Sequence, residues 1–269
     1  MQIHRVPSLD LPELAPYRTL KQVDEHRRAG LFVAEGDKVV ARLLQSHFSV
    51  ASVLLPEKRL AEFEPLIRAR PEDVPVYIIE IRVLEKLTGF PFFQGVLAVG
   101  KVPETPPLET ILRESPTPRL FVAIDGLTNS ENVGVIVRNA AAFGVHAVLI
   151  DRSSASPFLR RAVRNSMGSI FKLPIVESER ITDTLTQLRA AGVRVIAAHP
   201  HADGRTIADV NFRTDCCIVL GSEGTGISRD VLAVCDEAVA IPMSNEVDSL
   251  NVGSAASVFL YEAARQRCA

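Results

Sequence analysis

Short apolar runs alternate with helix-like segments along the chain, and this alternation restricts the possible folds more than any other feature of the sequence. In the second half, apolar runs begin at residues 119, 146, 193, 216 and 238, and segments with apolar residues at helical spacing lie between them. Short buried strands separated by helices are typical of a mostly parallel sheet that is covered on both faces. The sequence therefore predicts an α/β fold whose ligands bind at the loops leaving the carboxyl ends of the strands.

A proline-rich segment interrupts the alternation. Residues 101–118 contain five prolines in eighteen positions, which excludes a long helix or a central strand and leaves room for one helical turn around Leu108–Leu112. We therefore predict a small α/β domain over residues 1–100, a linker over residues 101–118 and a larger α/β domain over residues 119–269.

The same patterns predict the individual elements. In the N-terminal domain they favour strands at residues 31–36, 50–55, 74–80 and 94–102, and helices at residues 12–28, 37–47, 57–69 and 82–89. In the C-terminal domain they favour helices at residues 130–144, 157–168, 181–192 and 249–267. At the first of these, Thr128 with Glu131 three residues later fits a capping box, and Gly144 fits a C-terminal stop.

The composition excludes several classes of protein. With 47% apolar residues the chain can bury a core, but no apolar run approaches the ~18–20 residues of a membrane span. The first residues lack the apolar core of a signal peptide, so we expect a cytoplasmic protein. The cysteines show no ligand spacing, and we expect reduced, structural thiols and no metal site at Cys216, Cys217, Cys235 and Cys268.

A formal net charge of −2 argues against indiscriminate binding of nucleic acid, because phosphate contacts come from Lys and Arg. A local basic patch is nevertheless present between residues 151 and 172. A single acid there accompanies Arg152, Arg160, Arg161, Arg164 and Lys172. These basic side chains either form a solvated helix face or contact RNA.

Residues 130–145 form the first of three segments with unusual chemistry. They have the composition of a core helix, yet they include Asn132, Gly134 and Arg138. Asn132 lies in the first turn, near the unpaired N–H groups that favour anions. Gly134 and Arg138 lie four positions apart and share a face, so the arginine would lie over the gap that the glycine leaves. An arginine directed to solvent and a glycine that admits a neighbouring helix also explain this pattern.

The other two segments follow predicted strands. Residues 218–228 place Glu223 among three glycines within six positions, a spacing that allows close backbone approach but matches neither a phosphate loop nor a dinucleotide fingerprint. Residues 241–262 lead from a strand through a polar loop into a helix that begins near Ser249. Ser249 and Asn251 fit either helix capping or ligand contact. A tight turn and simple capping thus remain alternatives to a binding site.

Taken together, the three segments resemble the SpoU (TrmH-like) family of RNA ribose 2′-O-methyltransferases, in the SPOUT superfamily. Asn132, Gly134 and Arg138 match its N-x-G-x-x-x-R signature, and residues 221–226 match its G-S-E-G-x-G loop. Residues 241–243 and 249–252 match its I-P-M and S-L-N-V motifs. In addition, residues 27–44 and 92–99 are similar to the small RNA-binding domain that precedes many of its catalytic domains.

The resemblance implies a C-terminal sheet with a deep trefoil knot, which periodicity alone does not predict. It implies a homodimer with the active sites near the subunit interface. The implied cofactor is S-adenosylmethionine, and no metal is needed. By matching position, the cofactor would be held by Leu220, Gly221, Gly226, Ile241, Met243 and Leu250.

The implied reaction methylates a ribose 2′-hydroxyl. The matching catalytic residues are Asn132, Arg138, Glu223, Ser249 and Asn251, with RNA contacts from Arg160, Arg161 and Arg164. Because a guanidinium stays protonated, Arg138 is expected to stabilise developing charge rather than to act as a base, with Glu223 pairing with it.

Ribosomal RNA is favoured as the substrate, because the extra N-terminal domain is commoner among enzymes that act on it. Transfer RNA is the first alternative, and a non-catalytic RNA-binding protein on the same scaffold is the second. A small-molecule α/β enzyme with a nucleotide cofactor is a third. The chain departs from many relatives before Asn132, where they have Asp-Pro, and at Gly253, where they have Ser.

Overall fold

The computed structural model describes residues 1–19, 28–88, 95–200, 202, 204–245 and 247–268. Its contacts divide the chain into two compact units. The first comprises Met1–Glu104 with Phe158–Phe171, and the second Thr105–Pro157 with Lys172–Ala269. The division at Glu104 falls inside the proline-rich segment. The sequence predicts residues 158–171 to lie in the C-terminal domain, but their contacts group them with the N-terminal unit.

The N-terminal unit is built on a five-stranded sheet with the order β1-β4-β3-β5-β2. Its strands are β1 (Gln2–Arg5), β2 (Leu31–Glu35), β3 (Val50–Leu55), β4 (Pro75–Ile78) and β5 (Leu97–Lys101). β4 pairs in parallel with β1 and β3, and β5 pairs antiparallel with β2 and β3. The four predicted strands are confirmed. β1 was not predicted, because its four exposed residues contain no apolar run.

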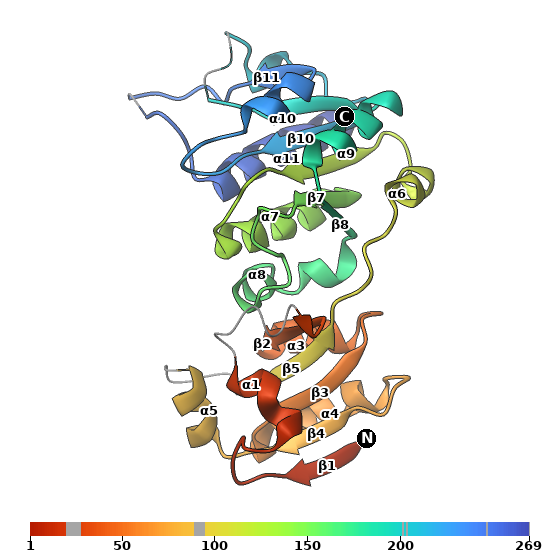
Figure 1. Ribbon diagram of the computed structural model, residues 1–269, viewed down its shortest axis with the longest axis vertical. Coiled ribbons are helices and arrows are strands. Elements are labelled where there is room, and N and C mark those ends of the chain that lie inside the picture. The colour runs from red at the N-terminus through yellow and green to blue at the C-terminus, as the bar shows by residue number, and fades with distance from the viewer. Residues whose placement is uncertain (20–27, 89–94, 201, 203, 246, 269) are drawn as a thin grey trace. The chain divides into compact units, whose positions relative to one another are not determined.

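The helices of this unit alternate with the strands along the chain, and Figure 1 shows them beside the sheet. They are η1 (Pro12–Leu14), α1 (Ala15–Arg18), α3 (Asp37–Leu44), η2 (Glu57–Arg59), α4 (Leu60–Arg68) and α5 (Ile81–Thr88). Helices were predicted in each of these places. Of the helix predicted over residues 12–28, residues 20–27 lie outside the described part.

Residues from the second half of the chain complete the core of the N-terminal unit. They form α8 (Arg160–Asn165) and η3 (Ser169–Lys172), and α8 packs against β2. The Phe32 ring stacks on that of Phe171, with 5.7 Å between ring centroids, and lies at the same distance from that of Phe158. These buried aromatic contacts explain why the segment belongs to this unit.

The C-terminal unit contains a six-stranded sheet with the order β11-β9-β10-β6-β7-β8. Its strands are β6 (Leu120–Ile124), β7 (Ala147–Asp151), β8 (Ile175–Ser178), β9 (Arg194–Ala198), β10 (Cys216–Leu220) and β11 (Glu237–Val239). All neighbouring pairs are parallel, in agreement with the predicted fold class. The edge strand β8 was not predicted. The trefoil knot stays a prediction.

Helices cover both faces of this sheet (Figure 1). α6 (Leu108–Glu114), α9 (Ile181–Ala190) and α10 (Arg229–Val234) pack on one face, and the short η4 (Ile207–Asp209) follows β9. α7 (Ser130–Ala142) and α11 (Val252–Arg267) pack against each other and against strands of the sheet. None of the described helices is both long and apolar enough to span a membrane.

The cysteines are all free thiols in the structure. Burial raises the pKa of Cys217 well above its usual range and that of Cys235 to about 12. Both thiols therefore stay protonated at neutral pH, whereas the thiolate is the reactive form of cysteine.

Candidate cofactor and substrate site

The carboxyl ends of β9, β10 and β11 open onto a cavity of about 490 Å³ in the C-terminal unit. The strand order reverses between β6 and β10, and such reversals place ligand sites at the adjoining loops. All six residues predicted to hold the cofactor line this cavity: Leu220, Gly221, Gly226, Ile241, Met243 and Leu250. Glu223, Ser249 and Asn251 line it as well.

The glycine-rich loop after β10 folds back on itself. The Ser222 N–H donates to the Gly226 carbonyl at 3.0 Å, and the Gly226 N–H donates to the Ser222 carbonyl at 2.9 Å. A Cβ on Gly221 would lie 2.3 Å from backbone atoms of Gly226 and Ile227, and Gly226 has a φ of +70°. Only glycine fits both positions, so the loop presents its backbone to the cavity in one fixed form.

Three polar side chains meet at the edge of the cavity, one from each of the three sequence segments. The Asn132 amide donates to Glu223 Oε1. The Asn251 amide donates to the same oxygen at 3.0 Å and to Asn132 Oδ1 at 3.2 Å. Asn132 is buried, with 9% of its surface exposed, whereas Glu223 and Asn251 are exposed. We call Asn132, Glu223 and Asn251 the amide–carboxylate triad.

The helix starts that carry the triad differ from the prediction. Asn129, not Thr128, caps α7, and its side chain accepts the Glu131 N–H at 2.9 Å. The predicted capping box is therefore wrong by one residue. Gly144 does end the helix, with a φ of +73°. 

α11 begins three residues later than predicted. Its first residue is Val252, and Asn251 is its cap, with Oδ1 accepting the Gly253 N–H at 3.0 Å. Ser249 therefore lies in the preceding loop, where it is exposed. Asn251 is thus both a helix cap and a member of the triad.

Arg138 does not join the triad. It is exposed on α7 and makes no hydrogen bond or ion pair with any residue of the described part of the chain. Asn132 and Arg138 lie six positions apart, and a helix turns by about 100° per residue, so they point about 120° apart. The expected pairing of Glu223 with Arg138 is absent, since the Glu223 carboxylate accepts two amides instead. Gly134 is buried on α7.

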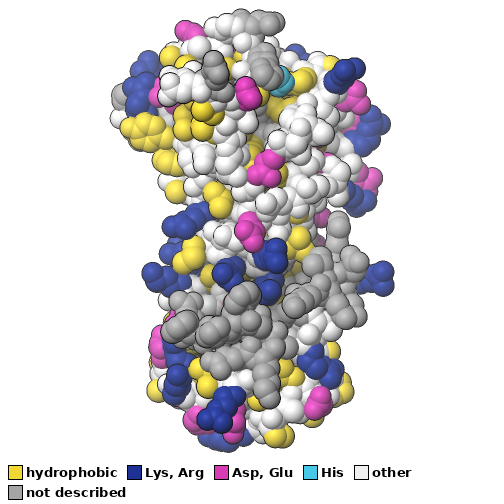
Figure 2. Space-filling model, turned by 90° about the vertical axis from the view of Figure 1, so that its left-hand side faces the viewer, with side chains coloured by type: hydrophobic (Ala, Val, Ile, Leu, Met, Phe, Trp, Pro, Cys, Tyr) yellow, Lys and Arg dark blue, Asp and Glu magenta, His cyan; other side chains and the backbone are white. Residues whose placement is uncertain are grey.

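The three arginines predicted to contact RNA lie in the N-terminal unit and are not equivalent. Arg160 Nη1 lies 2.5 Å from Glu35 Oε2, and Arg164 Nη1 lies 3.3 Å from Glu35 Oε1. Arg160 is only 20% exposed, whereas Arg164 is 62% exposed, and Arg161 is also exposed. On the face drawn in Figure 2, basic side chains are interspersed with acidic ones rather than forming one continuous surface. Arg160 and Arg164 thus share the Glu35 carboxylate, and Arg160 is the more buried of the two.

Several residues that line the cavity were not predicted from the sequence, among them His199, Asp248 and Phe259. His199 directly follows β9, so the rule that ligands bind at the carboxyl ends of strands could have identified it. Asp248 lies in the polar loop before α11 and was overlooked beside Ser249 and Asn251.

A second network holds the loop that leads from β6 into α7. Asp151 Oδ1 accepts the Gly126 N–H at 3.2 Å, and Ser154 Oγ accepts the Leu127 N–H at 3.0 Å. Burial opposes ionisation of Asp151, but hydrogen bonds from Ser153, Ser154 and Gly126 prevail and lower its pKa below the usual value. The ionised Asp151 carboxylate therefore helps to hold the loop that precedes α7 and Asn132.

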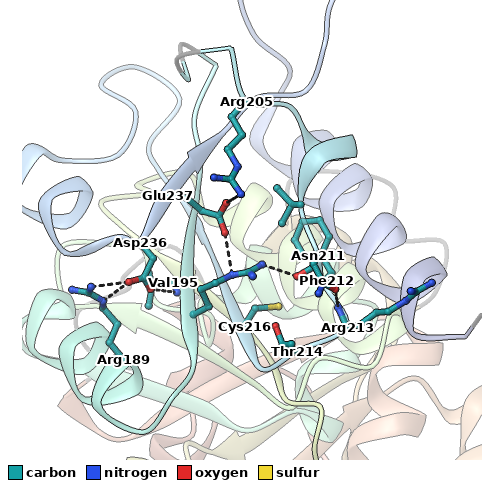
Figure 3. Close-up of polar contacts among 12 residues, drawn as sticks. Arg189, Val195, Arg205, Asn211, Phe212, Arg213, Thr214, Cys216, Asp236 and Glu237 are labelled. Atoms are coloured by element: carbon teal, nitrogen blue, oxygen red, sulfur yellow. Dashed lines mark hydrogen bonds and ion pairs between the residues drawn. The ribbon is translucent and has the colours of Figure 1, made fainter.

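A second hollow of the C-terminal unit, of about 440 Å³, lies among charged side chains that are already paired. Figure 3 shows part of this network: Arg189 lies 2.7 Å from Asp236, and Arg205 lies 3.0 Å from Glu237. Glu237 also lies 3.0 Å from Arg194. Within the part of the chain that the structure describes, no group of three or more His, Cys, Asp or Glu could hold a metal ion. The first cavity is therefore the stronger candidate site.

Comparison with known proteins finds relatives named as RNA methyltransferases. A family model described as the SpoU rRNA Methylase family matches residues 119–261. A protein of Mycobacterium tuberculosis named an uncharacterized tRNA/rRNA methyltransferase is 33% identical to this chain, covering 98% of this chain and 93% of its own. 

Two crystal structures are similar over nearly the whole chain. The SpoU methyltransferase AviRb from Streptomyces viridochromogenes is 27% identical with a TM-score of 0.80, covering 94% of this chain and 95% of its own. An AdoMet-bound rRNA methyltransferase from Sinorhizobium meliloti is 25% identical with a TM-score of 0.85, covering 98% of both chains.

Proposed function

Because the chain belongs to the SpoU rRNA methylase family, we propose that it methylates a ribose 2′-hydroxyl in structured RNA, with S-adenosylmethionine as the methyl donor. The observation that carries the proposal is the cavity, which brings the second and third sequence segments together beside the amide–carboxylate triad. The first segment contributes Asn132 to that triad. A cavity alone would suit many ligands, but this combination links a donor pocket to polar groups able to orient a second substrate.

The lining of the cavity fits S-adenosylmethionine. Leu220, Ile241 and Leu250 offer apolar surface for an adenine ring, and the loop at residues 221–226 offers backbone groups for its polar edges. Glu223 and Asp248 place two carboxylates at the cavity for a ligand of net positive charge. When bound, S-adenosylmethionine supplies an electrophilic methyl group on a sulfonium.

The protein's own part is to orient the hydroxyl and to stabilise the charge that develops on it. In the proposal, Asn132 and Asn251 hold the Glu223 carboxylate in place, and Ser249 completes the polar wall. Arg138 binds a phosphate next to the target ribose and stabilises the developing alkoxide, the usual role of a guanidinium. A phosphate oxygen or a water molecule accepts the proton.

The exposed position of Arg138 fits a site completed by a second copy of the chain. On the neighbouring helix α11, Val258 is 37% exposed and Tyr261 is 58% exposed. The Tyr261 ring packs edge-on against that of Phe143, with 6.3 Å between the ring centroids. Large exposed apolar side chains on paired helices are typical of subunit interfaces. We propose a homodimer through α7 and α11, which leaves Arg138 free to act near the interface.

The N-terminal unit is proposed to bind RNA, with exposed Arg161 and Arg164 among its contacts. We favour ribosomal RNA over transfer RNA as the substrate. The names of the similar proteins include rRNA methyltransferase and tRNA/rRNA methyltransferase, which supports an RNA substrate without separating the two classes.

The test is transfer of labelled methyl groups from S-adenosylmethionine to total RNA from a strain that lacks the gene, followed by mapping of the 2′-O-methyl site. We expect incorporation at one or a few ribose positions of ribosomal RNA. Label in transfer RNA would instead identify transfer RNA, not ribosomal RNA, as the substrate. Binding of the donor without incorporation into any RNA would refute the enzymatic proposal and favour a non-catalytic RNA-binding protein.

A further inference from the structure

Asn132, Val135 and Asn139 form a stripe along α7 that faces the first turns of α11. Residues spaced by three and then four positions share one side of a helix. The Asn139 amide donates to the Gly253 carbonyl at 3.1 Å and to Ser257 Oγ at 2.7 Å. Val135 contacts α11 at Gly253, where an added Cβ would lie 2.8 Å from Val135 Cγ1. The stripe therefore joins the two helices at both ends and in the middle.

Gly253 links Asn139 to the triad. Its carbonyl accepts the Asn139 amide, and its N–H donates to Asn251 Oδ1 at 3.0 Å. The other end of the Asn251 side chain donates to Glu223 and Asn132. A ring of hydrogen bonds thus runs from Asn139 through Gly253 and Asn251 back to Asn132 on the same helix.

We propose that Asn139 is a positioning residue for methyl transfer: through Gly253 it sets where the Asn251 amide lies relative to Asn132 and Glu223. The inference rests on the proposed function. An apolar side chain at residue 139 would keep α7 and α11 packed together. It would not fix the position of one helix along the other, because van der Waals contacts are less directional than two hydrogen bonds. Small displacements of polar groups at a reaction centre lower rates strongly.

The first test replaces Asn139 with Leu, which has the same number of side-chain heavy atoms and the same branching, and with Ala in case the larger leucine side chain prevents folding. We expect kcat to fall about 10- to 100-fold, with the KM for RNA and the Kd for S-adenosylmethionine within about twofold of wild type. Asn211→Ala is the control, because Asn211 is an exposed asparagine outside the cavity lining and should leave kcat unchanged. 

A second test uses the close approach at Gly253. Gly253→Ala should lower kcat, because the new methyl group meets Val135 and moves the start of α11. Val135→Ala removes the nearest opposing atom, Val135 Cγ1, and leaves contacts of 3.2 Å to Asn251 Oδ1 and 3.3 Å to the Cβ of residue 135, so the double variant should recover part of the lost kcat. Val135→Ala should give no recovery to Asn139→Leu, since that variant lacks hydrogen bonds rather than space. A general loss of stability would not show this pattern.

A third measurement is independent of activity. In protein with ¹⁵N-labelled asparagine, the side-chain amides of Asn132 and Asn251 should exchange slowly with solvent in wild type and faster in Asn139→Leu. Wild-type kcat in the variant, equal losses of kcat and donor affinity, or unchanged amide exchange would each overturn the inference. If wild type transfers no methyl group, the proposed function fails, and the amide exchange still decides whether Asn139 positions the triad.

Discussion

Replacing Gly221 with alanine should open the loop that closes one side of the donor cavity. In the structure an added Cβ would lie 2.3 Å from Gly226 C and Ile227 N and 2.5 Å from Gly226 O. Ordinary contacts of carbon atoms lie at about 3.5–4.0 Å. The obstacles are backbone atoms, which cannot rotate away as a side chain can. The two sides of the loop must therefore separate by about 1 Å or more.

This separation breaks the two hydrogen bonds between Ser222 and Gly226, which measure 3.0 and 2.9 Å. Each backbone hydrogen bond contributes about 0.5–1.5 kcal/mol net, so the closed loop loses roughly 1–3 kcal/mol. If donor binding requires the closed loop, affinity should fall by about 5- to 150-fold, since 1.4 kcal/mol corresponds to tenfold.

Isothermal titration of S-adenosylmethionine into wild type and Gly221→Ala measures this difference. Gly224→Ala is a comparison variant in the same loop: a Cβ at Gly224 meets no atom within 4 Å among the residues that the structure describes, so it should leave the two hydrogen bonds of the loop intact, although Gly224 also lines the cavity. Thermal unfolding of both variants separates a local opening of the loop from loss of the fold. Wild-type affinity in Gly221→Ala would refute the assignment of this loop to the donor.

Glu223→Gln keeps the shape of the side chain and removes its charge, so single-turnover methyl transfer should slow about tenfold or more; an unchanged rate would exclude Glu223 from the reaction. Arg160→Ala removes one of the cations beside the Glu35 carboxylate, which is only 10% exposed. The free energy of unfolding, measured by urea denaturation, should fall by about 1–3 kcal/mol. Adding Glu35→Gln should restore much of that loss. Burial lowers the pKa of His146, whose Nδ1 accepts the Leu120 N–H at 3.0 Å. The stability from neutral His146 is therefore full above the usual pKa of about 6.5 and is lost as pH falls. In urea titrations, the difference in the free energy of unfolding between wild type and His146→Asn should narrow from pH 8 to pH 5.5. A constant difference would contradict this reasoning.

Local pattern predicted most of the fold because the buried strands are continuous apolar runs. The exceptions show what that pattern requires. β8 (Ile175–Ser178) is a four-residue edge strand with an exposed residue inside it, and β1 (Gln2–Arg5) is wholly exposed. Neither has enough apolar residues to differ from a loop, so pairing with a neighbouring strand defines them. The shift from Thr128 to Asn129 has a similar origin, because both residue types are good caps and lie side by side.

Contacts between distant residues were beyond local pattern. Residues 158–171 were predicted as part of the C-terminal domain because they follow β7, but Phe158 and Phe171 complete the aromatic core around Phe32. Similarly, the sequence identified Asn132 and Glu223 through separate motifs, whereas their hydrogen bond spans 91 positions. The sequence pattern assigned no role to Asn139, whose hydrogen bond to Gly253 appears only in the structure.

The triad also bears on how the site treats charge. Glu223 Oε1 accepts both amides, and none of the described cations pairs with the Glu223 carboxylate. An amide shares a hydrogen bond without cancelling the negative charge, so the carboxylate keeps its attraction for a cation that enters the cavity. Under the proposed reaction the donor is positively charged at sulfur and the demethylated product is not. The same carboxylate therefore favours the donor over the product, and an arginine paired with Glu223 inside this unit would have weakened that preference.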